Sequence, residues 1–241
     1  VRLLGEFVRD SGMPTDPSLL TREHVESFIA SILEKYKPAT ASNRFRALQQ
    51  FFKWLLEEGE IERNPMERMK RPIVPEEPPD VLTEVQLARL LKTCEGKDFT
   101  ARRDTAIIRM FVDTGMRRNE LVSLKVSDVD FDHNVAVVLG KGRRPRACPF
   151  GRKTSRDLDR YLRERAKHRD ASAESLWLGQ AGPMTANGIY QVIRDRAIAA
   201  GIGPIHPHQL RHTFAHEWLV AGGNEGDLMR LAGWRSRTML Q

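Results

Sequence analysis

Cysteine is scarce in this chain, with two among 241 residues, Cys94 and Cys148. Two isolated thiols form neither a disulfide framework nor the paired spacing of a zinc site, so we interpret both as ordinary thiols in a reducing cytoplasm. Long apolar runs are also lacking, because no stretch approaches the about 18 residues needed to span a bilayer. The sequence therefore predicts a cytoplasmic protein with no membrane partner.

Acidic residues are fewer than basic residues in this sequence. Lysine and arginine together number 39 against 32 aspartate and glutamate residues, which gives a formal net charge of +7. This balance favours an anionic partner, although charge alone names no function. The length is sufficient for one large domain or two small ones, each with a real core.

The first part of the chain has the apolar spacing of helices throughout. We expect helices over residues 2–10, from the N-cap Thr21 onward, and over residues 38–58. Asn64-Pro65 stops this pattern, and the proline-rich segment that follows cannot be helical. These features predict a helical domain over residues 1–73, a linker over 74–80 and a larger domain over 81–241.

The larger domain mixes helices with a few strands. A capping box at Thr83 predicts a first helix, and an apolar run predicts another over 104–114 that stops at Gly115. Alternating residues predict strands over 126–131 and 135–139 and a third toward Phe150. Further helical patterns cover 153–167, 185–200, the segment after His206 and 225–231. The predicted fold class is mainly α with a small antiparallel β-sheet, in two domains.

The segment after His206 has the most informative side chains. At helical spacing His208, Arg211 and His212 share a face. A guanidinium grips a phosphate with two hydrogen bonds, and an imidazole exchanges a proton near neutral pH, so this face suits an anionic substrate. One alternative is a helix end with a few exposed histidines. Another is a zinc site of His208, His212 and His216, although an arginine between the ligands would repel a cation.

Four features occur in a fixed order along the chain. Arg117 with Glu120 follows Gly115, a lysine lies between two glycines on a predicted hairpin turn, His208 precedes Arg211, and Trp234 ends a Leu-Ala-Gly-Trp segment. Together these motifs resemble the tyrosine recombinase family, the phage-integrase type of site-specific recombinase. The resemblance covers nearly the whole chain. It implies an N-terminal helical core-binding domain over 1–73 and a C-terminal α+β catalytic domain over 81–241.

The resemblance implies an enzyme that cuts and rejoins duplex DNA and requires no metal or other cofactor. Arg117 and Arg211 would stabilise the negative charge that develops on the non-bridging oxygens of the scissile phosphate. Lys141 would protonate the departing 5′ oxygen, and His208 would act as a base toward the nucleophile. Trp234 stands where many relatives have a second histidine, and its indole N–H would donate to the phosphate.

Two further residues of these motifs are given supporting roles. Glu120 is expected to fix Arg117 rather than to touch substrate. His212 is expected to hold its helix against the neighbouring elements.

The nucleophile of the family is a tyrosine nine residues after the His/Trp position, which corresponds to position 243, whereas the sequence ends at Gln241. Tyr36, Tyr161 and Tyr190 are the tyrosines present, and they lie in unrelated predicted helices. Enzymes of this family act through a 3′-phosphotyrosine intermediate. The chain as given is therefore expected to bind DNA without cleaving it, because it lacks the nucleophile. The alternatives are a non-catalytic DNA-binding relative with a regulatory role and a type IB topoisomerase.

Basic and polar residues outside the motifs are the candidate DNA contacts, with a solvated helix face as the alternative for the first group. A patch at the start of the third helix comprises Thr40, Ser42, Asn43, Arg44 and Arg46. Two other pairs are Lys70 with Arg71 and Arg143 with Arg144. The expected partners are a specific double-stranded DNA site and further copies of the chain, which would form a dimer to tetramer on the DNA. The protein is expected to be associated with the nucleoid.

Overall fold

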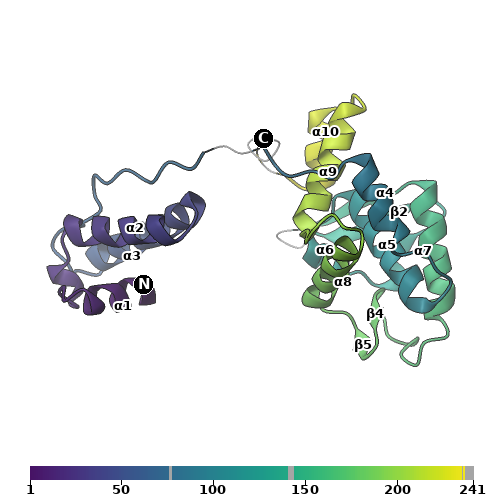
Figure 1. Ribbon diagram of the computed structural model, residues 1–241, viewed down its shortest axis with the longest axis horizontal. Coiled ribbons are helices and arrows are strands. Elements are labelled where there is room, and N and C mark those ends of the chain that lie inside the picture. The colour runs from purple at the N-terminus through teal and green to yellow at the C-terminus, as the bar shows by residue number, and fades with distance from the viewer. Residues whose placement is uncertain (76–77, 141–143, 235, 237–241) are drawn as a thin grey trace. The chain divides into compact units, whose positions relative to one another are not determined.

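The computed structural model describes residues 1–75, 78–140, 144–234 and 236. The chain divides into two compact units, Val1–Glu77 and Pro78–Gln241, each with its own hydrophobic core (Figure 1). Each unit is described here by itself. The core-binding and catalytic roles of the two domains stay predictions.

The N-terminal unit is helical. Its elements are α1 (Arg2–Asp10), the 3₁₀ helix η1 (Pro17–Leu19), α2 (Arg22–Lys35) and α3 (Pro38–Glu57). α2 begins after Thr21, whose backbone N–H donates to His24 Nδ1 at 3.1 Å, and α3 has proline at its start, where no N–H is required. The three predicted helices are confirmed, with α3 ending one residue early. The prediction that Ser42 belongs to the polar patch is wrong, because this residue is buried against the core.

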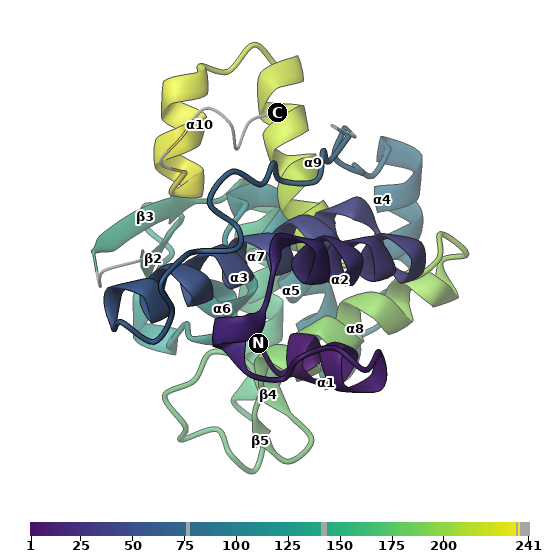
Figure 2. The ribbon, with the colours of Figure 1, turned by 90° about the vertical axis from the view of Figure 1, so that its left-hand side faces the viewer.

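The second unit contains the remaining helices. They are α4 (Glu84–Lys92), α5 (Phe99–Thr114), α6 (Arg118–Val122), α7 (Arg152–Arg165), α8 (Ala186–Ala199), α9 (Pro207–Val220) and α10 (Glu225–Ala232). In the view of Figure 2 α9 and α10 stand side by side at the top, and the two helices contact each other. None of the helices in the described ranges is both long and apolar enough to span a bilayer.

The sheet is small and antiparallel. Strands β1 (Val129–Asp130), β2 (Val135–Leu139) and β3 (Pro145–Pro149) pair in that order, and β4 (Leu178–Gly179) pairs separately with β5 (Gly182–Pro183). The predicted strand over 126–131 is wrong for most of its length, since Val126–Asp128 forms the 3₁₀ helix η2. The Asp128 carboxylate accepts the Lys125 N–H at 2.8 Å, and this local bond favours a turn over an extended strand.

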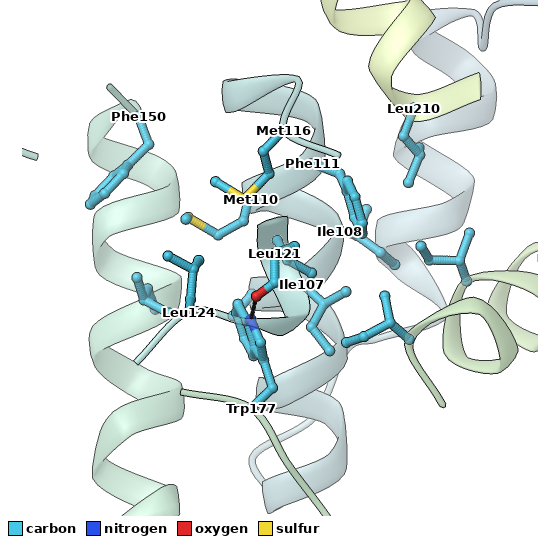
Figure 3. Close-up of a cluster of buried hydrophobic side chains, with 14 of the residues drawn as sticks. Ile107, Ile108, Met110, Phe111, Met116, Leu121, Leu124, Phe150, Trp177 and Leu210 are labelled. Atoms are coloured by element: carbon cyan, nitrogen blue, oxygen red, sulfur yellow. Dashed lines mark hydrogen bonds between the residues drawn. The ribbon is translucent and has the colours of Figure 1, made fainter. Parts of the chain in front are cut away.

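α5 is the centre of the second core. It packs against α7, α8 and α9, and Ile107, Ile108 and Phe111 are fully buried (Figure 3). The helix begins five residues before the predicted start, because Asp98 caps it by accepting the Ala101 N–H at 3.0 Å. Opposite α5, the indole N–H of buried Trp177 donates to the carbonyl of Leu121 at 2.9 Å, which ties α6 to the core (Figure 3).

Candidate active site

Arg117 lies between two helices at the N-cap of α6. Its backbone N–H donates to Glu120 Oε2 at 2.7 Å, and its Nη1 donates to Glu120 Oε1 at 3.0 Å. Its Nη2 donates to the carbonyl of Gly233 at 2.9 Å, beyond the end of α10. Arg117 is therefore fixed at two sides, yet 39% of its side chain stays exposed for a ligand.

Arg211 projects from α9 and is 2% exposed. Its Nη1 donates to the carbonyl of Gly115 and its Nη2 to the carbonyl of Ala232. The guanidinium carbon lies 5.1 Å from the ring centre of Trp234, a cation–π contact. Burial, and then the positive charge of Arg117, lower the pKa of Arg211 to about 10, so the group remains charged at neutral pH.

His208 and His212 lie one turn apart on α9. Their rings meet edge to face with centroids 4.8 Å apart. Burial, followed by the charges of Arg211 and Arg117, lowers the pKa of His208 below its ordinary value. Burial and the neighbours His208 and Arg211 lower the pKa of His212 as well. Both imidazoles are therefore neutral at pH 7, the form that accepts a proton.

Three of the side chains described above lie at one open cavity of about 600 Å³. Arg117, His208 and Arg211 line it together with side chains from α8, among them Tyr190, whose ring stacks on His206 at 5.4 Å. Within the described residues no group of three or more His, Cys, Asp or Glu side chains is placed to hold a metal ion. The cavity is thus lined by Arg117, Arg211 and the neutral imidazole of His208, together with Arg118 and His206, a set suited to a phosphate.

The other predicted site residues fall in three places. Lys141 and Arg143 lie outside the described residues, and Arg144 is exposed just before β3. Trp234 lies against Arg211, as given above. The remaining candidates belong to the N-terminal unit. Arg46 Nη2 donates to Asn43 Oδ1 at 2.5 Å, and the guanidinium carbon of Arg44 lies 5.0 Å from the centre of the Tyr36 ring. Thr40 is half-buried, and Lys70 and Arg71 are exposed.

The structure adds a residue that sequence reasoning missed. Arg146 on β3 donates to both oxygens of Glu120, at 3.1 and 2.9 Å, and none of the sequence motifs includes it. A signal was present in the alternation of β3, in which Arg146 and the buried Cys148 share the inward face. A charged side chain on the inward face of a strand requires a partner.

Gly115 must be glycine at the point where α5 ends. Its φ is +56°, and an added Cβ would lie 2.2 Å from the ring of Phe214. We expect Gly115→Ala to destabilise the protein by about 2–4 kcal/mol, the left-handed backbone cost plus that of overpacking. Gly201→Ala is the matched control, because its φ is +67° and nothing lies within 4 Å of the added Cβ. Urea unfolding compares the two, and equal losses would contradict the clash.

Comparison with known proteins places this geometry in a family. Residues 80–241 match the model of the "Phage integrase family". Tyrosine recombinase XerC of Roseiflexus castenholzii is 31% identical over 229 residues, covering 92% of this chain and 73% of the relative, and XerD of Listeria monocytogenes is 31% identical over 228 residues, covering 91% and 76%.

Solved structures agree with these sequence matches. The crystal structure of XerA recombinase aligns over 100% of this chain and 83% of its own, with a TM-score of 0.63 and 26% identity. A XerH recombinase bound to a palindromic difH substrate shares the fold, with a TM-score of 0.79 at 19% identity over 98% of this chain and 72% of its own. The chain therefore belongs to the phage integrase family of tyrosine recombinases.

Proposed function

We propose that this protein cuts and rejoins duplex DNA at a specific site through a 3′-phosphotyrosine intermediate, with residues 1–73 as a core-binding domain, 74–80 as linker and 81–241 as the catalytic domain. The observation that supports it most is the convergence of Arg117, His208 and Arg211 on one cavity from the start of α6 and from α9. Transesterification at phosphorus places extra negative charge on the non-bridging oxygens, and two fixed guanidinium groups stabilise it where it develops.

The proton transfers are assigned to other groups. His208, neutral at pH 7, accepts the proton of the attacking hydroxyl. Lys141 donates a proton to the departing 5′ oxygen. Trp234 holds the Arg211 guanidinium and offers an indole N–H to the phosphate. His212 supports the His208 ring, and Glu120 orients Arg117.

The attacking group is expected to be a tyrosine at position 243. The test mixes a protein that includes this position with a nicked duplex, from which the short fragment with the released 5′ hydroxyl diffuses away. A covalent protein–DNA band joined at the 3′ phosphate should then accumulate. Cleavage should be unaffected by EDTA, since arginines and a lysine take the place of metal ions in this mechanism. An absent band in a protein that binds the duplex would favour the alternative, a regulatory DNA-binding relative.

DNA binding by this chain should depend steeply on salt. Basic residues of both units would displace counterions from the phosphates, and for roughly six contacts a doubling of salt weakens binding about 40-fold. The double variant Lys70→Gln/Arg71→Gln should flatten the slope of log affinity against log salt by about two. Fluorescence anisotropy with duplex DNA measures both slopes. An unchanged slope would mean that the two exposed side chains contact no phosphate.

A further inference from the structure

Arg146 binds Glu120 as well as Arg117 does, and the proposed function gives Arg146 no role. Its two terminal nitrogens donate to the two carboxylate oxygens of Glu120 in a parallel fork, at 3.1 and 2.9 Å. The Arg117 guanidinium reaches the same carboxylate through one bond of 3.0 Å. Each oxygen of Glu120 thus accepts one bond from each arginine, because the Arg117 backbone N–H also donates to Oε2 at 2.7 Å.

Gly233 closes the other side of this pair. An added Cβ at Gly233 would lie 2.4 Å from Arg146 Nη1 and 3.3 Å from Arg117 Nη1, so the backbone after α10 rests against both guanidinium groups. The Gly233 carbonyl also accepts a bond from Arg117 Nη2. Arg117 is therefore clamped between Glu120 and Gly233, while Arg146 holds the Glu120 end of the clamp.

The sharing of Glu120 has an electrostatic consequence. Burial would raise the pKa of Glu120, but the hydrogen bonds from Arg146 and from the Arg117 N–H outweigh it and leave the pKa lowered, so the carboxylate is ionised. A carboxylate paired with Arg117 alone would cancel much of the charge that a phosphate requires. Because the Arg146 guanidinium also binds both oxygens, Arg146 balances part of the carboxylate charge, and Arg117 keeps its orientation and more of the positive charge that a phosphate requires.

Arg146 occupies this position at a cost in free energy. Its side chain is 13% exposed, and its Nε atom has no hydrogen-bond partner in the part of the chain that the structure describes. A buried donor without a partner lowers the stability of the folded protein. An apolar side chain of similar length would fill the same space without that cost, so packing alone does not account for an arginine here.

We propose that Arg146 is a positioning residue for Arg117: it binds both oxygens of Glu120, and Glu120 thereby orients Arg117 toward the scissile phosphate without neutralising it. The proposal rests on the function proposed above.

The test uses single-turnover cleavage by a protein that includes position 243. Band formation by the wild type tests the proposed function alone, before any variant is compared. Arg146→Met should then cleave about 10–100-fold more slowly, the usual effect of removing a group that orients a catalytic one. Its affinity for duplex DNA should be unchanged, because Arg146 contacts Glu120 and not the substrate. Unchanged cleavage in a folded Arg146→Met variant would overturn the proposal.

Two further variants separate positioning from charge and from packing. In an Arg117→Ala background, Arg146→Met should slow cleavage no further, because its effect passes through Arg117; additive slowing would overturn the proposal. Arg146→Lys keeps the charge but not the fork, so it should remain slow, and wild-type speed would equally overturn the proposal. If Arg146→Met fails to fold by circular dichroism, the lysine variant supplies the same comparison.

A matched control removes another buried arginine. Arg103 pairs with Asp104 at 2.7 Å and is 7% exposed, in the same unit but outside the cavity. Arg103→Met should lower the stability of the protein and leave the cleavage rate of the folded fraction unchanged. Equal slowing by Arg103→Met would assign the effect of Arg146 to general packing and overturn the proposal.

Discussion

Replacing Arg211 should nearly abolish DNA cleavage. Its side chain is 2% exposed and its guanidinium is held by the carbonyls of Gly115 and Ala232, so it is fixed at the cavity and need not reorganise when a phosphate binds. Removing one such fixed donor typically slows a reaction by about 10²–10³-fold, or roughly 3–4 kcal/mol. Arg211→Lys should be as slow as Arg211→Ala to within about tenfold, because an ammonium cannot make two parallel bonds.

Loss of folding has to be separated from loss of catalysis in these variants. Arg211→Ala leaves two carbonyls unpaired, which also lowers stability. Arg165 is the matched control, since it is 5% exposed and donates to four backbone carbonyls in the same unit, away from the cavity. Arg165→Ala should unfold at lower urea yet cleave normally when folded. A normal rate for folded Arg211→Ala would refute its role in the transition state.

Replacing Lys141 should be nearly as damaging on ordinary DNA, and harmless on one modified substrate. The described ends of its turn are joined by the Gly140 N–H, which donates to the Arg144 carbonyl at 2.9 Å. An ammonium gives up its proton, whereas a guanidinium, whose ordinary pKa is much higher, scarcely does, which favours the lysine over its arginine neighbours as the acid. Lys141→Ala should slow cleavage by roughly 10²–10⁴-fold.

The modified substrate has sulfur in place of the 5′ bridging oxygen. A thiolate leaves without protonation, so Lys141→Ala should cleave it at close to the wild-type rate. Equal slowing on both substrates would mean that Lys141 only binds phosphate. The control is Arg144→Ala, and sulfur rescue of that variant instead would transfer the general-acid role to the arginine.

The sequence was sufficient for the elements whose signals are local. Thr83 and Gln86 formed the predicted capping box, and the apolar spacing of residues 38–58 matched α3. The start of α5 was missed because charged residues such as Arg103 precede the apolar run, whereas the structure buries Arg103 in a pair with Asp104. A charged pair that satisfies itself inside the core has no signature in hydrophobic periodicity.

Contacts at the site depended on the fold and could not be predicted in the same way. Motif order identified Arg117, His208 and Arg211, and the cavity that all three line came only with the packing of α6 and α9. The Arg146–Glu120 fork joins a strand to a short helix, and its partner could not be named from spacing along the chain. Long-range pairings of this kind require the tertiary structure.

The hydrogen-bond acceptors that hold Arg211 are main-chain oxygens, those of Gly115 and Ala232. Every amino acid has a carbonyl, so these two hydrogen bonds depend on where α5 and α10 end and not on the identity of the side chains there. Substitutions that preserve the helix ends therefore leave these two bonds of Arg211 intact, whereas the orientation of Arg117 also depends on the Glu120 side chain.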